Sequence, residues 1–488
     1  MISKHGEAKS LFRAVSVLLS VISVFILMCM LAGLALGEGL AAVRAFALPS
    51  ALGALLFSLS FLVVTERVVL SSRFGYLFVV LSWVSASVIG ALPFFLSGWI
   101  PSFIDSLFES MSGFTTTGAT ILTDIESLPR SLLLWRATTH WLGGMGIVVL
   151  TVAIFPLLGI SGRALMEAEA PGPQVDKFTP RLSQTASILW LVYLGLTVAL
   201  VALLMLGGMD IIDAVTHSFA TMATGGFSTK NASVGTFGSA YIDAVMTVFM
   251  VLAGSNFALH WKLLHGDFRS VFRDSEWKAY IAIFGVASVL VTLNLRSSGA
   301  YEGFFASLRF ASFQVASILT TTGFGTADYL QWPFFSQAVL FAVMFIGGCS
   351  GSTGGGIKVG RILTLVKMGF AEMRYMVNPR GVFGIFMNRQ YMNKKIVYNI
   401  AAMVWLYLCT VIISTLVVAW GGFDIMTSLT ATLATLGNIG PGFSLVGPLY
   451  NYAFFPDWIK LWLYAMMLVG RLEVFTVFVL FTKSFWKR

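Results

Sequence analysis

Long apolar runs separated by short polar segments account for most of the chain. The first run extends from Ala14 to about Leu36, which is too long for the apolar core of a signal peptide and predicts a membrane-spanning helix. Nine further runs of similar character follow, so the pattern predicts ten spans. These nine runs cover residues 45–65, 74–96, 131–158, 185–207, 239–262, 278–296, 335–370, 396–420 and 457–482.

From about residue 74, one unit of span, short amphipathic segment, polar turn and second span occurs four times. The short segments begin at Phe103, Met209, Tyr301 and Phe423. At 1.5 Å per residue, about 10–15 residues cannot cross about 30 Å of hydrocarbon, so each segment is expected to enter the membrane partway and return. Non-helical backbone at that depth is tolerated only where it is buried in protein or lines a water-filled cavity.

A Thr/Gly motif follows each short segment, and the four motifs lie at intervals of 108, 97 and 114 residues. Four copies of one hairpin predict four walls of a single pore. The motifs are Thr115-Thr116-Thr117-Gly118-Ala119, Thr224-Gly225-Gly226-Phe227, Thr320-Thr321-Thr322-Gly323-Phe324 and Ala434-Thr435-Leu436-Gly437-Asn438.

The chemistry of these motifs suits a cation that has lost its water. Four extended strands can surround an ion with backbone carbonyls, threonine hydroxyls can add ligands, and glycine permits the close approach. The motifs carry no charge, which favours a large monovalent ion over Ca²⁺ or Mg²⁺, and K⁺ is the expected ion. One glycine per copy predicts a looser filter than that of a potassium channel. The predicted filter residues are Thr116, Thr117, Gly118, Thr224, Gly225, Gly226, Thr321, Thr322, Gly323, Thr435, Leu436, Gly437 and Asn438.

Composition and charge agree with a membrane protein. Of the 488 residues, 57% are hydrophobic and 11% are charged, whereas a soluble domain carries about 25% charge. About three quarters of the Lys and Arg residues fall in loops that the ten spans place on one side, which predicts cytoplasmic termini and leaves no support for nucleic-acid binding. The three cysteines lie in apolar segments without metal-site spacing.

The repeats, the two preceding spans and three further motifs together resemble the membrane subunits of bacterial Trk potassium uptake systems, within the wider Trk, Ktr and HKT superfamily. The resemblance covers essentially the whole chain, and the extra N-terminal pair of spans favours the Trk type. It implies a homodimer in the bacterial inner membrane, with one pore per subunit, and a cytoplasmic ring of nucleotide-binding regulatory subunits. The three motifs are His140-Trp141-Leu142-Gly143-Gly144-Met145-Gly146, Asn438-Ile439-Gly440-Pro441-Gly442 and the run from Gly347 to Gly356.

The expected fold is an all-α polytopic membrane protein, with four helix–pore loop–helix repeats around a central pore and an additional N-terminal transmembrane hairpin. The predicted boundaries are 1–73 for the hairpin and 74–183, 184–275, 276–392 and 393–488 for the repeats. The cytoplasmic loops 161–183 and 262–278 are either docking sites for the regulatory subunit or plain connectors.

A glycine-rich run interrupts the second span of the third repeat, where so many glycines cannot maintain a regular helix. It either gates the pore, as the resemblance implies, or provides a packing surface of small residues. Lys358 is either an anchor for this loop or a charge in the pore. The predicted gate residues are Gly347, Gly348, Gly351, Ser352, Thr353, Gly354, Gly355, Gly356 and Lys358.

Arg471 and Glu473 lie within the last apolar run. Charges inside a membrane are costly and face a cavity or a partner. The resemblance implies that Arg471 is a positive barrier beneath the filter, and the alternative is a structural ion pair.

Two rival functions are considered. Gly348-Cys349-Ser350-Gly351 matches a motif of intramembrane serine proteases, but the sequence supplies no histidine assigned to Ser350, and a phosphate loop fails because Ile357 follows Gly356. An enzyme is therefore not expected, nor is an organic cofactor. A tightly coupled H⁺ or Na⁺ symporter for K⁺ remains the alternative, with Glu473 as its candidate proton carrier.

Overall fold

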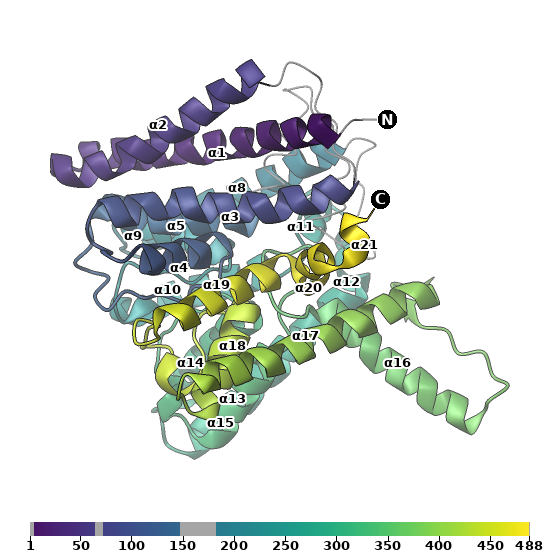
Figure 1. Cartoon of the computed structure of the whole chain (residues 1–488). Helices are drawn as coiled ribbons and strands as arrows, with labels where there is room; N and C mark the ends of the chain where they lie inside the picture. The colour runs from purple at the N-terminus through teal and green to yellow at the C-terminus, as the bar shows by residue number, and fades with distance from the viewer. Residues whose placement is uncertain (1–3, 64–71, 147–181, 488) are drawn as a thin grey trace.

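The computed structural model describes residues 4–63, 72–146 and 182–487. The axes of most long helices are roughly aligned, and the start of α1 and the end of α21 lie at the same end of the molecule (Figure 1). Within the described ranges, six helices are long and apolar enough to span a membrane, and two further pairs pass the same test but are bent by 102° and 110°. The chain is therefore a multi-pass, mainly helical membrane protein.

The N-terminal hairpin consists of α1 (Lys4–Ala35) and α2 (Leu40–Val63), and it lies along one side of the bundle next to α3 (Figure 1). The turn between the two helices attaches the hairpin to the first repeat. There, Glu38 accepts hydrogen bonds from the backbone nitrogen of Ser131, at 3.0 Å, and from its hydroxyl.

Each repeat has a first spanning helix, a short helix and a second helix. The first helices are α3 (Ser72–Leu96), α8 (Leu182–Leu206), α13 (Ser275–Ser297) and α17 (Lys394–Trp420). The short helices are α4 (Phe103–Phe114), α9 (Ile211–Met222), α14 (Phe304–Leu319) and α18 (Ile425–Leu436). The second helices begin with α5 (Arg130–Gly144), α10 (Ala240–Ala253), α15 (Phe334–Met344) and α19 (Asp457–Arg471).

The second helices differ from the continuous spans expected from the sequence. The predicted spans 239–262 and 457–482 are each bent, because α11 (Phe257–Leu264) and α20 (Glu473–Phe478) start new helices. Asn256 begins α11 by accepting a hydrogen bond from the amide of Ala258, and Glu473 has a φ of +56°. The end of the predicted span 131–158, beyond residue 146, lies outside the described residues, as do most of loop 161–183 and the basic residues 67, 163, 177 and 181.

In the third repeat, a loop at residues 345–358 separates α15 from α16 (Val359–Val377), as the glycine run predicts. Helix α16 extends away from the bundle at the end where α1 begins (Figure 1). The shorter elements are η2 (Ser233–Phe237), α12 (Phe268–Arg273), η3 (Tyr329–Gln331), β1 (Phe386–Met387), β2 (Gln390–Tyr391), η4 (Ser444–Val446), η5 (Val479–Phe481) and α21 (Lys483–Trp486).

The short helices have clear starting signals. Ser102, Asp210 and Asp424 each accept a hydrogen bond from the amide three residues later, which satisfies one free donor at the helix start. The hydroxyl and amide of Thr427 lower the pKa of the Asp424 carboxyl in this way. Twelve residues give each of these three helices a length of about 18 Å, which ends them inside the bundle.

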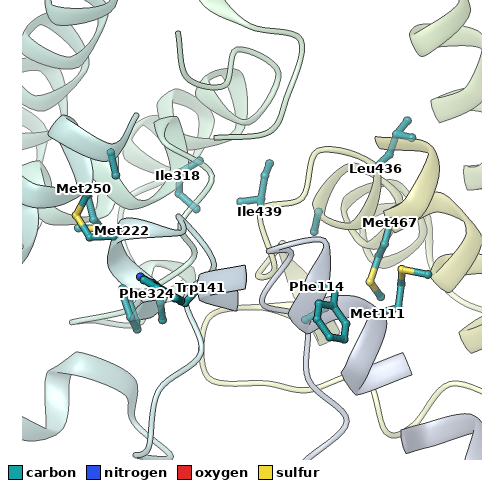
Figure 2. Close-up of a cluster of buried hydrophobic side chains, with 14 of the residues drawn as sticks. Met111, Phe114, Trp141, Met222, Met250, Ile318, Phe324, Leu436, Ile439 and Met467 are labelled. Carbon is teal, nitrogen blue, oxygen red and sulfur yellow. The ribbon is translucent and has the colours of Figure 1, made fainter. Parts of the chain in front are cut away.

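Buried apolar side chains from all four repeats surround the ends of the short helices. Figure 2 draws this cluster, including Met111, Met222, Ile318 and Leu436 from the last turns of α4, α9, α14 and α18. The core of the molecule therefore lies around the four hairpins and fixes their positions.

Candidate functional site: a ring of four hairpins

The four hairpins have the same backbone geometry. The residue after each helix cap has a positive φ of 52–60°, in Thr116, Thr224, Thr321 and Asn438. Two residues later, Gly118, Gly226, Gly323 and Gly440 have φ values of 79–93°. Positive φ is rare for threonine, and such strain persists only where the surrounding structure enforces it.

These glycines close a ring. A Cβ atom on Gly118 would collide with the carbonyl oxygen of Gly225 in the second hairpin. The same collision would occur between Gly226 and the Thr322 oxygen, and between Gly323 and the Ile439 oxygen. A Cβ on Gly440 would meet the Thr117 oxygen of the first hairpin. Each hairpin therefore contacts the next, and the fourth contacts the first.

The fourth hairpin differs from its prediction by three residues. Gly437 was expected to be the counterpart of Gly118, but it caps α18 with a φ of −79°, as Thr115 caps α4 with a φ of −77°. Thr435 and Leu436 lie in the last turn of α18. The amides of Gly437 and Ile439 bond back to Leu433 and Ala434, as those of Thr115 and Thr117 bond to Met111 and Ser112. The structural counterparts of Thr116, Thr117 and Gly118 are therefore Asn438, Ile439 and Gly440.

A polar residue six or seven positions before each helix cap holds the strand that leaves the hairpin. Glu109 accepts hydrogen bonds from Thr120 and the Ile121 amide. His217 bonds Ser228 at 2.9 Å, Gln314 donates to the Ala327 oxygen, and Thr430 bonds both backbone groups of Phe443. Sequence reasoning missed these residues, although in the first three repeats the polar residue stands nine positions before the motif glycine, which was an available signal.

The strongest of these supports is an ion pair behind the first two hairpins. Arg136 Nε lies 2.6 Å from Glu109 Oε1, and both side chains are at most 2% exposed. Arg136 also donates to the Ser228 oxygen at 2.9 Å, and its guanidinium carbon lies 3.6 Å from the centre of the Phe227 ring. Removing one partner would leave the other charge buried, a change that costs about 3–5 kcal/mol.

The loop at 345–358, which contains the predicted gate residues, lies against the ends of three short helices. Thr353 Oγ1 donates to the Met222 oxygen at 3.0 Å, at the end of α9. The amide of Gly355 donates to Thr321 Oγ1 at 2.7 Å, and the amide of Gly356 donates to the Gly437 oxygen at 3.0 Å. The loop therefore contacts the second, third and fourth hairpins or their helices.

Other residues of the loop attach it to the broken second helix of repeat 2. The amide of Cys349 donates to the Gly254 oxygen at 2.8 Å, and the Gly351 oxygen accepts from the amide of Phe257 at 3.1 Å. Gly347 and Gly348 lie close to Gly355 and Gly254 respectively, where a Cβ would not fit. Ser352 folds back to the Cys349 oxygen at 2.6 Å.

Lys358 ends the loop with a φ of +82°, and its ammonium group donates to the Gly354 oxygen. Of the two roles considered for Lys358, the geometry accords with an anchor that holds the loop closed on itself.

Arg471 joins the first hairpin to the loop. Its Nη1 atom donates to Thr116 Oγ1 at 3.2 Å and to the Thr353 oxygen at 2.8 Å. Its Nη2 atom donates to the Gly144 oxygen at 2.7 Å and to that of Gly143. The partly exposed guanidinium therefore lies where α5, α19, the first hairpin and the loop meet.

Glu473 has a different neighbour. One of its oxygens lies 2.5 Å from Arg361 Nη2 in α16, so the two charges form an ion pair across the breaks of repeats 3 and 4. The carboxylate of Glu473 therefore links α20 to α16.

Comparisons with known proteins agree with this geometry. A model of the TrkH family, described as cation transport protein, matches residues 41–293 and 306–488. The Trk system potassium uptake protein TrkH of Escherichia coli K12 is 43% identical over 425 residues, covering 86% of this chain and 88% of that protein. The corresponding value for TrkG of the same strain is 34% over 421 residues, covering 86% of each chain.

A solved structure is similar over nearly the whole chain. The crystal structure of the potassium transporter TrkH from Vibrio parahaemolyticus superposes with a TM-score of 0.87 at 36% sequence identity. The match covers 99% of this chain and all of that one.

Proposed function

The chain belongs to the TrkH family of cation transport proteins, and we propose that it conducts K⁺ across the bacterial inner membrane through the ring of four hairpins. The closed ring of glycine-to-carbonyl contacts carries this proposal, because it gathers uncharged oxygens from all four repeats at one place. Its relatives are named as transport proteins, so the expectation that the chain is not an enzyme is confirmed.

The ring supplies the ligands that a dehydrated K⁺ ion needs. We assign one tier of ligands to the backbone carbonyls of Thr117, Gly225, Thr322 and Ile439, which stand beside the ring glycines. The C-terminal ends of α4, α9, α14 and α18 lead into the hairpins, and their partial negative charge favours a cation. Thr116, Thr224, Thr321 and Asn438 stand one position before this tier, whereas Thr435, Leu436 and Gly437 form the last turn and cap of α18 and are not assigned to the pathway. Potassium is preferred because the related proteins are named as potassium uptake proteins.

We assign the gate to residues 347–358. The loop contacts the second, third and fourth hairpins or their helices, so a shift of the loop would change the space below all three. Non-helical backbone at this depth needs hydrogen-bond partners or water, and the contacts to Thr321, Gly437 and Gly254 provide such partners.

Arg471 acts in this proposal as an electrostatic barrier. Its hydrogen bonds to Thr116 and Thr353 hold a positive charge directly next to the first hairpin and the gate. A cation that leaves the filter would approach this charge and be slowed.

The oligomeric state and the partner are proposed from the resemblance to the Trk systems. We propose a homodimer controlled by a cytoplasmic nucleotide-binding regulatory subunit, with both termini in the cytoplasm. The common location of the start of α1 and the end of α21 supports termini on one side of the membrane (Figure 1). Basic side chains of α16 and the following loop, Lys367, Arg374, Arg380 and Arg389, lie at that end and suit the cytoplasmic face.

The first test is uptake of ⁸⁶Rb⁺ into liposomes that contain the purified protein, with and without competing K⁺ or Na⁺. Competition by K⁺, and loss of uptake or entry of Na⁺ in Gly118→Ser and Gly323→Ser, would support the proposal. Rubidium uptake that neither substitution changes would exclude the hairpins as the filter. Absence of flux under every gradient, with a regulatory subunit added, would exclude a gated channel.

A further inference from the structure

A groove on the outside of the bundle lies between the second and third repeats. It has a volume of about 610 Å³ and is lined by residues of α10, α13 and α14. Cavities of about 300–1,000 Å³ hold small ligands in proteins. The groove lies near the first turns of α10 and α14, and therefore at the side of the membrane where the short helices begin.

Asp243 is the unusual residue of this groove. Its side chain is 2% exposed, and its Oδ2 atom lies 2.7 Å from Arg309 Nε. The second oxygen, Oδ1, is buried and has no hydrogen-bond partner among the described residues. A buried carboxylate oxygen without a donor is costly, so the site lacks a hydrogen-bond donor that a ligand could supply.

Arg309 provides the opposite charge on the same wall. Its side chain is 28% exposed, and only Nε is engaged by a hydrogen bond to the described residues. The terminal nitrogens of the guanidinium therefore remain for an acceptor, and a phosphate group matches their fork geometry. The groove thus offers one acceptor and one fork of donors next to each other.

Apolar side chains flank this pair of charges. Val248 and Phe305 line the groove and are 56% and 83% exposed. On the neighbouring α13, Val286, Val289 and Leu293 are also exposed and would face hydrocarbon in a membrane. A ligand with a polar end at Asp243 and Arg309 would therefore have its remaining length in an apolar environment.

We propose that this groove binds a zwitterionic phospholipid with a primary ammonium group, that is, one of the phosphatidylethanolamine type. The ammonium donates to Asp243 Oδ1, the phosphate accepts from the terminal nitrogens of Arg309, and the acyl chains lie along Val248 and Phe305. The bound lipid links α10 of the second repeat to α14 of the third.

The headgroup is specified by the two charges. A choline headgroup has the same phosphate but no N–H donor for Asp243. An anionic glycerol headgroup has hydroxyl donors but no positive charge to balance the carboxylate. Binding should therefore be strongest for ethanolamine and weaker for both other headgroups of the same chain length.

The test measures lipid binding to the delipidated full-length protein by native mass spectrometry, with ethanolamine, choline and glycerol phospholipids of identical chains. The ethanolamine lipid should bind at least about tenfold more tightly than the choline lipid, as expected for a charge-assisted hydrogen bond. Asp243→Asn should remove this preference. Ala244→Leu, which fills the groove without altering the ion pair, should weaken binding of all three lipids.

Arg296→Gln is the matched control, because Arg296 is an exposed cation of α13 that does not line the groove. It should leave binding unchanged. Equal binding of the ethanolamine and choline lipids would overturn the proposal. So would unchanged lipid binding in Ala244→Leu, or a loss of dimer in that variant without a loss of lipid, which would assign the groove to a second copy of the chain.

Discussion

Gly440 has the same conformation and the same neighbour relationship as Gly118, Gly226 and Gly323. We expect Gly440→Ser to impair K⁺ selection as strongly as Gly323→Ser does. A side chain at a φ of +93° costs about 1–3 kcal/mol, and its Cβ would press on the Thr117 carbonyl. Because the displaced Thr117 carbonyl belongs to the ring, we expect K⁺ over Na⁺ discrimination to fall about tenfold, equivalent to about 1.4 kcal/mol, measured as competition for ⁸⁶Rb⁺ uptake.

Gly422→Ser is the control for backbone strain. Gly422 belongs to the same repeat and has a φ of +88°, but no atom lies within 4 Å of the Cβ that would be added. It should retain normal selectivity even if the protein is less stable. Equal loss of selectivity in both variants would mean that strain, rather than the ring, is responsible.

Arg471→Ala should raise K⁺ flux. The substitution removes a positive charge beside Thr116 and Thr353, and a tenfold rise in flux would correspond to a barrier lowered by about 1.4 kcal/mol. Arg471→Lys keeps the charge and should keep the flux low. Single-channel or liposome flux of folded, monodisperse protein would measure both variants. If lysine and alanine raised the flux equally, Arg471 would act through its hydrogen bonds to Gly143 and Gly144 and not through its charge.

A substitution in the loop between α15 and α16 tests whether this loop gates the pore. In Gly355→Ala the added Cβ would collide with the Gly437 oxygen. The hydrogen bond from the amide of residue 355 to Thr321 Oγ1 would also be disturbed. We expect a displaced loop, with a several-fold higher basal flux and a weaker response to the regulatory subunit. A several-fold change in flux corresponds to a change of only about 1 kcal/mol in the free energy that favours the observed position of the loop.

Gly369→Ala in α16 is the control, because no atom lies within 4 Å of its added Cβ. It should behave as the unchanged protein, and its helix should be slightly stabilised. Unchanged flux and unchanged response in Gly355→Ala would remove the loop from the gating mechanism.

The fourth hairpin shows what a sequence motif can and cannot locate. Matching the letters Thr-x-Gly selects Thr435 to Gly437, which end the helix α18. The hairpin itself begins at Asn438, because an asparagine there adopts the positive φ that threonine adopts in the other three copies. The resemblance to the Trk systems already included Asn438 to Gly440, but without their structural role. Backbone conformation was the missing information.

The helix breaks have a similar explanation. Apolar periodicity predicts the long helices α1, α2, α3, α8, α13 and α17 because each crosses the bundle without interruption. The bends after α10 and α19 leave the apolar pattern intact, so hydropathy alone reads them as continuous spans. Only the glycine run at 347–356 disturbs composition strongly enough to reveal a break.

At the scale of the whole molecule, the family match and the similar crystal structure confirm the fold class and the family predicted from the sequence. The prediction was possible because repeats of about 100 residues are visible in the order of apolar runs. The ion pair of Glu109 and Arg136 was not predicted, because the two residues meet only when α4 and α5 pack within the folded first repeat, where Arg136 also reaches Ser228 of the second repeat. Pairings between distant residues follow from the closed ring, which no local pattern describes.

The ion pair of Glu473 bears on whether K⁺ movement is coupled to another ion. A coupled symporter needs a carboxylate that can exchange protons, and Glu473 was the candidate. Its carboxylate lies 2.5 Å from Arg361 Nη2, so it is already engaged in a structural ion pair that joins α20 to α16. We therefore expect K⁺ to move down its own electrochemical gradient alone. In proteoliposomes the reversal potential should change by roughly 59 mV for a tenfold change in the K⁺ gradient.

A pH gradient distinguishes the two mechanisms. With one H⁺ moved per K⁺, each unit of pH difference would shift the reversal potential by about 30 mV, half the value for a single ion, whereas a channel would show no shift. Glu473→Gln should then leave the reversal potential unchanged and alter only stability or gating, because it weakens the link between α16 and α20. A pH-dependent reversal potential that Glu473→Gln abolishes would instead make Glu473 the proton carrier of a symporter, with the ring of hairpins serving as its K⁺ site.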